Sequence, residues 1–268
     1  MNSILDFLQV ETKLAEVQPA TLFNIAGIPI TNAMLLGVIV SIGLIIATIY
    51  TYKNLTLKVD GYQATIEATV EYFFNLTKQI MPNEKSAREL LPLVGAILIF
   101  FGFSNMIDLL PGVTAFNYGD KNLLRAPTND FNMTFSIGAA VVLLAQWGSI
   151  KQFGPFGYIG KFIKIKKVYK GFKSGLSDGA MALVQFGIGI IDILSEVAKA
   201  FSLSLRLFGN MYAGAVLMSL LLGAFAFLVP TVWLAFSLLV AVIQALVFGA
   251  LAAAYYAVAI QNPEPEAD

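Results

Sequence analysis

Arg206 is the side chain with the clearest capacity for chemistry, because it is a permanent charge inside an apolar segment. The stretch 201–214 reads FSLSLRLFGNMYAG, and after Lys199 the chain has no other lysine or arginine. An arginine stays protonated in essentially any protein environment. Placing it at bilayer depth costs roughly 3 kcal/mol on insertion scales. This position therefore predicts a partner of opposite charge or a water-filled path.

Other polar side chains recur around this arginine at helical spacing. Ser202 and Asn210 lie four residues before and after it, so the three form one stripe on a helix. Asp192 and Glu196 come earlier, and Glu196 is spaced to form an ion pair with Lys199. A buried ion pair between Glu196 and the arginine is the structural alternative to a functional role, although nearly three helical turns separate them.

The last apolar segment carries few polar groups. Gln244 lies among small residues, and Ser237 precedes it by two helical turns. The turn before this segment is centred near Phe225, so Arg206 and Gln244 each lie 19 residues from it. We therefore expect these two side chains at similar depth and within hydrogen-bonding reach. Gln244 and Asn210 would support Arg206 or line a polar path.

The composition is that of a membrane protein. The chain of 268 residues is 57% hydrophobic and 13% charged, with a mean hydropathy of +0.75, whereas soluble domains average about 25% charged residues. Histidine and cysteine are absent, which excludes disulfides, thiolate chemistry and the commonest metal ligand and proton carrier. Any ion carried here must use carboxylates, hydroxyls, amides or water.

We expect an all-α integral membrane protein with about five transmembrane helices and one interfacial amphipathic helix. The amphipathic segment, 62–81, has apolar residues at helical spacing, and a packed amphipathic helix is the alternative to a membrane-surface one. The apolar spans are predicted at 33–50, 90–110, 131–150, 181–228 and 231–260, with the turn between the last two at 223–230.

The fourth span is unusually long. Residues 181–228 contain no proline and would extend about 70 Å as one helix, against roughly 30 Å of hydrocarbon. The segment must either break near 192–200 or lie obliquely. Because that stretch reads DILSEVAKA, without turn residues, we favour one oblique helix. With the last helix also strongly tilted, the pair would present a broad, slanted surface to a large curved partner.

Lysines set the expected orientation. Seven of them lie between Lys151 and Lys173, and the positive-inside rule places such a cluster in the cytoplasm. The loop around Asp120 and the N-terminus then face outside, and the C-terminus is cytoplasmic.

Four stretches resemble subunit a, the stator ion-channel subunit of F-type ATP synthases. The most specific is SLSLRLFGNMYAG at 202–214, which surrounds the intramembrane arginine. The others are NMIDLLP at 105–111, RAPTNDFNMT at 125–134 and QALVF at 244–248. The resemblance covers about 90–260, and the N-terminal portion agrees in topology only.

The resemblance implies two half-channels that carry protons to and from carboxylates on a rotor ring, with Arg206 as the stator charge between them. It places Asn210 and Gln244 in the lining of this site. Asp192 matches a carboxylate position earlier on the long helix, and Asp108 matches one near the outer side. ATP chemistry happens elsewhere in the complex, so the chain is not an enzyme on its own.

The implied partners are a ring of c subunits, peripheral-stalk b subunits, the catalytic sector and the lipid bilayer, with no nucleic acid, cofactor or metal. The expected location is the bacterial plasma (inner) membrane. The chain then forms a single membrane domain, 1–268. It comprises an external segment (1–32), the first span and interfacial helix (33–81), an ion-channel core (88–260) and a cytoplasmic tail (261–268).

One departure from the family pattern concerns the proton path. Many members carry a Glu and a His that face each other across the long helices, and the corresponding positions here are Ala215 and Ser237. Water held by Asn210, Gln244 and Ser237, with Asp192 or Glu196 as the carboxylate, is the expected substitute. A Na⁺-coupled version stays open, because oxygen ligands suit a hard cation.

A secondary transporter is the alternative from a different class. Such proteins typically show internal repeats and spans interrupted by Gly or Pro at matching positions. Neither feature is present in this sequence.

Overall fold

The computed structural model describes residues 18–25, 27–56, 61–110, 117–118, 121–162, 176–224 and 228–261. Its long helices are α2 (Asn32–Lys53), α3 (Gly61–Ile80), α4 (Glu84–Asp108), α5 (Phe131–Phe162), α7 (Leu176–Ala224) and α8 (Leu228–Ile260). Within these ranges, five helices are long and apolar enough to cross a membrane: α2, α4, α5, α7 and α8. The predicted all-α membrane fold is confirmed.

Small elements lie at one end of the bundle. The strands β1 (Thr21–Ile25) and β2 (Ile28–Thr31) pair antiparallel, as do the two-residue strands β3 (Asn117–Tyr118) and β4 (Lys121–Asn122). A single turn of 3₁₀ helix, η2 (Pro127–Asn129), precedes α5. The prediction for 1–32, an external segment, did not foresee the first hairpin.

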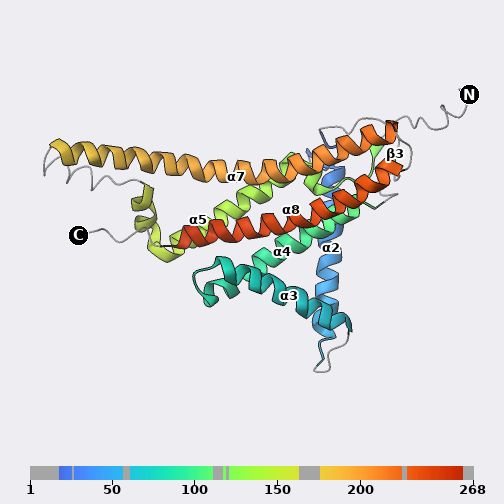
Figure 1. Ribbon diagram of the computed structural model, residues 1–268, viewed down its shortest axis with the longest axis horizontal. Helices are drawn as coiled ribbons and strands as arrows, with labels where there is room; N and C mark the ends of the chain where they lie inside the picture. Colours follow the sequence, from blue (N-terminus) through green and yellow to red (C-terminus); the bar gives the residue numbers. More distant parts are fainter. Residues whose placement is uncertain are drawn as a thin grey trace, which may run out of the picture.

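Helix α2 forms the first span and begins as the sequence predicts. The Thr31 hydroxyl accepts a hydrogen bond from the Met34 amide at 3.2 Å, which satisfies one of the free amides at the helix start. In Figure 1, α2 runs steeply across the direction shared by α7 and α8. This crossing supports a strong tilt of the last two helices relative to the first span.

Helix α3 packs along one edge against α4 and α8. Its Phe73, Phe74 and Ile80 contact a buried cluster that includes Leu90 of α4 and Ala253 of α8. This apolar edge of α3 is packed within the protein, as expected for the packed amphipathic helix, one of the two predicted alternatives.

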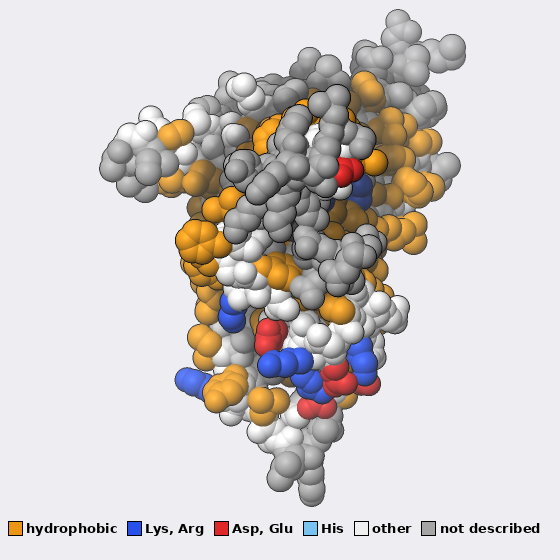
Figure 2. All heavy atoms as spheres, turned by 90° about the vertical axis from the view of Figure 1, so that its left-hand side faces the viewer, with side chains coloured by type: hydrophobic (Ala, Val, Ile, Leu, Met, Phe, Trp, Pro, Cys, Tyr) orange, Lys and Arg blue, Asp and Glu red, His pale blue; other side chains and the backbone are white. Residues whose placement is uncertain are grey.

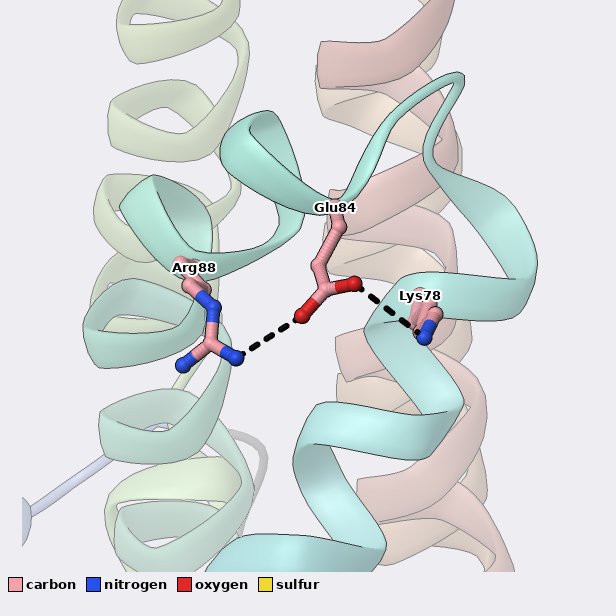
Figure 3. Close-up of polar contacts among 3 residues, drawn as sticks. All are labelled: Lys78, Glu84 and Arg88. Carbon is pink, nitrogen blue, oxygen red and sulfur yellow. Dashed lines mark hydrogen bonds and ion pairs between the residues drawn. The ribbon is translucent and has the colours of Figure 1, made fainter.

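An ion-pair network holds the α3–α4 turn. The Glu84 carboxylate accepts from Lys78 at 3.3 Å and from Arg88 at 2.7 Å (Figure 3). Figure 2 shows most of the Lys, Arg, Asp and Glu side chains of the face in view in its lower half, with hydrophobic side chains beside them. These pairs are exposed, so their contribution to stability is small.

Helix α5 extends beyond its predicted end. The third span was expected to stop near residue 150, but the helix continues to Phe162 with a break at Gly154. Gly154 has φ of +72°, a conformation that glycine adopts without steric cost. The end was placed wrongly because Lys151 was taken as a boundary, and one lysine at the membrane edge does not terminate a helix.

Helix α7 is unbroken from Leu176 to Ala224, so the oblique single helix is confirmed over the alternative of two spans. It starts earlier and ends earlier than predicted. Helix α8 begins at Leu228, three residues before the predicted start at Thr231, because a proline such as Pro230 is tolerated in the first turn of a helix. Figure 1 shows α7 and α8 side by side, with the start of α7 reaching beyond the other helices.

The main core lies where α4, α5, α7 and α8 meet. It is built from Ile97, Phe101, Val141, Leu203, Leu207, Met211, Ala245, Phe248 and Ala252. Close approach of α5 and α7 requires Gly138, because a Cβ there would overlap the Ser204 hydroxyl and lie 3.2 Å from the Ala200 carbonyl oxygen. The face of α7 that carries Leu203 and Leu207 is thereby fixed toward the core.

Several predictions lie outside the described residues. They concern residues 1–17, the loop around Asp120, the lysines from Lys164 to Lys173, and the tail 262–268. The assignment of the two sides of the molecule to the cytoplasm and the outside stays a prediction. So does the division of the single membrane domain into four segments.

Candidate functional site: an unpaired arginine on α7

Packing on one face of α7 turns Arg206 away from the core. Leu203 and Leu207 are 1% and 0% exposed, whereas Ser202 and Arg206 are both exposed. At about 100° per residue, Leu203 and Leu207 lie roughly 60° and 100° around the helix from Arg206, so the arginine lies beside the core-facing surface and stays exposed. The predicted stripe is thus present on an open face.

Arg206 forms no ion pair or hydrogen bond with any residue that the structure describes. Exposed apolar side chains lie around it on α7: Leu205, the preceding residue, is 53% exposed, and Leu217, three turns further along the same side, is 38% exposed. A permanent charge in an exposed apolar surface needs a partner from outside the chain. The alternative of a buried pair between Arg206 and Glu196 is excluded.

Asn210 bonds to Gln244 across the two long helices. Its Nδ2 donates to Gln244 Oε1 at 2.7 Å. Gln244 is 5% exposed, and its own Nε2 has no hydrogen-bond partner within the described part of the chain. The sequence predicted Gln244 at the depth of Arg206; instead it pairs one helical turn away, with Asn210. The antiparallel register places Phe248 opposite Arg206.

Glu196 is engaged by two side chains. Lys199 Nζ donates to its Oε1 at 2.6 Å, and Gln146 Nε2 on α5 donates to its Oε2 at 2.5 Å. The predicted pair between Glu196 and Lys199 is confirmed. Asp192, one turn earlier, is exposed and has no partner among the described residues. The two carboxylates proposed as alternatives therefore differ: Glu196 accepts two hydrogen bonds, and Asp192 accepts none from the described residues.

Ala215 and Ser237, where the family pattern would have a Glu and a His, lie in the last turns of α7 and the first turns of α8. Ala215 and Ser237 are both partly exposed, and Trp233, one turn from Ser237, donates from Nε1 to the Gly214 carbonyl at 3.3 Å. The indole thus joins α8 to α7 beside Ala215. Sequence reasoning gave Trp233 no role.

Asp108 is the last residue of α4, and the structure describes its backbone only. It lies at the same end of α4 as Asn105, which is fully buried. Whether the Asp108 carboxylate reaches the path stays a prediction.

A group of buried polar residues lies at the start of α5. It belongs to the 125–134 stretch that resembles the family, but sequence reasoning gave these residues no role. The Thr128 hydroxyl donates to Asn105 Oδ1 at 2.7 Å, which links η2 to α4. The Asp130 carboxylate, on a residue 3% exposed, accepts from the Asn132 amide at 2.9 Å and caps α5. Burial of these polar residues was not readable from the sequence, because their segment reads as a surface loop.

The described residues contain no cluster of three or more His, Cys, Asp and Glu that could hold a metal ion. The site therefore offers one fixed cation, amides, hydroxyls and a free carboxylate. Such groups can hold water, pair with an anion and attract or release protons, but they supply no nucleophile or redox centre.

Known proteins are similar in sequence to this chain along most of its length. The family model described as ATP synthase A chain matches residues 32–257. "ATP synthase subunit a" of Moorella thermoacetica is 28% identical over 91% of this chain and 97% of that relative. The protein of the same name from Desulforamulus reducens is 31% identical over 76% of this chain and 69% of its own length. Another, from Legionella pneumophila (strain Corby), is 28% identical over 90% of this chain.

The matched range includes α2, α4, α5, α7 and nearly all of α8, and therefore every helix that contributes to the main core. The chain belongs to the ATP synthase A chain family.

Proposed function

We propose that Arg206 is the fixed positive charge that faces rotor-ring carboxylates and separates two half-channels for ions. As a family member, the chain is the ion-channel stator subunit of an ATP synthase complex, and ATP chemistry takes place on other subunits. The observation that carries the proposal is the exposed guanidinium without a partner on the apolar face of α7.

The electrostatics of this charge account for ion release. An opposite charge within about 4 to 6 Å lowers the pKa of a carboxylate by 1 to 3 units. A rotor carboxylate that arrives at Arg206 therefore loses its proton, and one that moves on into lipid must regain a proton before it is desolvated. Because Arg206 cannot titrate, no ion passes it without movement of the ring.

The outer half-channel is proposed to run beside Asn210, Gln244 and Ser237 toward Asp108. The Nε2 of Gln244 supports this placement, because a buried donor without a partner is normally satisfied by water. Amide and hydroxyl groups with bound water would replace the Glu and His relay that the chain lacks at Ala215 and Ser237.

The inner half-channel is proposed to follow the stripe through Ser202 toward Asp192. Both side chains are exposed on α7. Of the two candidate carboxylates, Asp192 is the better ion carrier, because both oxygens of Glu196 already accept hydrogen bonds. Glu196, one helical turn from Asp192, then has a role other than carrying the ion.

The proposed neighbours follow from the complex. The face around Arg206 would contact the ring of c subunits, and the other helices would face lipid and peripheral-stalk b subunits. We propose a bacterial plasma (inner) membrane, with the N-terminus outside and the C-terminus in the cytoplasm. The matched relatives are bacterial proteins, which supports this location.

Either H⁺ or Na⁺ is compatible with these groups, and the proposal favours H⁺. In vesicles that contain the whole complex, ATP-driven pumping should proceed without Na⁺ and produce a pH gradient. Pumping that requires Na⁺ would instead assign the Na⁺-coupled version of the same subunit.

The decisive test is Arg206→Ala in the complete complex. We expect loss of ion-driven ATP synthesis, measured in vesicles with an imposed ion gradient, while ATP hydrolysis by the catalytic subunits persists. Arg88→Gln, which removes an exposed arginine from α4, is the matched control and should retain synthesis. Normal coupling in Arg206→Ala would overturn the proposal.

A further inference from the structure

Lys199 lies on the side of α7 that carries Arg206, but its ammonium group points toward Glu196 and Tyr255. It precedes Arg206 by seven residues, which is a rise of about 10 Å and a rotation of only about 20° from the same face. Its ammonium nevertheless contacts Glu196 at 2.6 Å and lies 5.6 Å from the centre of the Tyr255 ring on α8. The side chain of Lys199 is 26% exposed and that of Glu196 22%.

Glu196 comes from a different face of the helix. It is rotated by about 80° from Arg206, toward α5, where Gln146 donates to its second oxygen at 2.5 Å. This donor ties one carboxylate oxygen to α5, while the other oxygen independently accepts from the ammonium of Lys199. The arrangement draws the positive charge of Lys199 into the seam between α5, α7 and α8.

From this geometry we propose that Glu196 masks the charge of Lys199 and so keeps the inner half-channel beside Arg206 open to cations. The inference rests on the proposed function, in which cations travel along this face of α7. A lysine side chain is long and flexible. Without its counter-charge, the ammonium would turn toward water, which here is the ion path. A second fixed positive charge would then repel the ions that move between Asp192 and the rotor.

The masking role differs from two other roles that Glu196 could have. A proton carrier would be needed whether or not Lys199 is charged. A structural clamp would depend on the bond between Gln146 and Glu196, because that bond is the one that joins two helices. Masking depends only on the balance of charge between Glu196 and Lys199.

The test is a set of variants in the complete ATP synthase, reconstituted in lipid vesicles, with ATP-driven ion pumping measured per ATP hydrolysed. Glu196→Gln should slow pumping about tenfold, the order expected for one uncompensated charge some 10 Å away at an effective dielectric constant near 20. Lys199→Gln should stay close to the wild-type rate. The double variant, Glu196→Gln with Lys199→Gln, should recover most of that rate.

Gln146→Leu distinguishes masking from a clamp. It removes the tie between α5 and α7 but leaves the pair of Glu196 and Lys199, so masking predicts a rate near that of the wild type. A rate as low as that of Glu196→Gln would overturn the proposal in favour of a clamp. A double variant as slow as Glu196→Gln would overturn it in favour of a proton carrier.

Arg206→Ala, measured in the same vesicles, distinguishes failure of the masking role of Glu196 from failure of the proposed function of Arg206. If it abolishes coupled pumping while the double variant stays slow, only the masking role is wrong. If it leaves pumping coupled, the proposed function and the masking role are both wrong.

Discussion

Asn210 and Gln244 connect the two long helices one turn from Arg206, through a bond of 2.7 Å between Asn210 Nδ2 and Gln244 Oε1. The bond fixes the register of α7 against α8 at the level of the arginine. It also orients a buried amide whose Nε2 remains available to water or to a passing ion. A polar contact of this kind both positions the site and contributes to its lining.

Gln244→Leu should therefore impair transport. The change removes one net hydrogen bond, worth about 1 kcal/mol, or about a factor of five in an equilibrium that depends on it. We expect ATP-driven pumping to fall by about that factor, and Asn210→Leu to add little in the double variant, because both changes break the same bond. Gln185→Leu, also on α7, should leave pumping unchanged; an equal loss there would show a nonspecific effect.

Two glycines that flank the site should respond in opposite ways. Gly138→Val should lower the midpoint of thermal unfolding, because the added atoms overlap Ser204, and overpacking costs about 1 to 3 kcal/mol. Gly209 has open space at its Cβ position, so Gly209→Ala should not lower that midpoint.

The same Gly209→Ala should slow rotation-coupled pumping if the ring contacts this face closely. The unfolding midpoint is measured in detergent and pumping in vesicles. Together, Gly138→Val and Gly209→Ala separate the effect of packing within the chain from the effect of contact with the ring. Normal pumping in Gly209→Ala would argue against close approach of the ring at this position.

Asp192 should contribute to transport through its carboxylate. Asp192→Asn keeps the shape of the side chain but cannot exchange a proton, and we expect pumping to fall by about a hundredfold, the lower end of the range for loss of an acid–base group. Asp178→Asn changes another exposed carboxylate, in the first turn of the same helix, and serves as the control. Unaltered transport in Asp192→Asn would remove that residue from the path.

The stability of the chain should depend on pH through Asp130. Burial raises the pKa of this carboxyl above its ordinary value of 3.8, against the lowering effects of the Asn132 amide and of Arg125. The folded state then holds the proton more tightly than the unfolded state. The stability contributed by the group is fully present below about pH 3.8 and is lost as the pH rises through the folded-state pKa.

Asp130→Asn removes this titration while an amide oxygen can still cap α5. The midpoint of thermal unfolding in detergent, compared between wild type and variant from pH 3 to 7, should shift in favour of the variant as the pH rises. A constant difference across that range would contradict the raised pKa.

The sequence predicted the helices well where a long apolar run has a clear start or stop. The unbroken α7 followed from the absence of proline and turn residues, and the stripe of Ser202, Arg206 and Asn210 followed from helical spacing. The end of α5 was missed, because Lys151 was taken as a boundary, and the break at Gly154 was not foreseen, because it depends on a backbone conformation that the residue pattern does not specify.

The amino-acid sequence alone determined that Arg206 is a permanent charge within a membrane segment, because arginine cannot titrate and its flanks are apolar. It also determined that the Glu and His relay is absent. Only the tertiary structure decided which polar groups meet: Gln244 with Asn210 instead of Arg206, and Glu196 with Lys199 and Gln146. Such pairings depend on how far one helix slides and turns against the next. The burial of Leu203 in the core and the close approach of α7 to α5 at Gly138 help to set that register, and spacing along a single helix cannot reveal it.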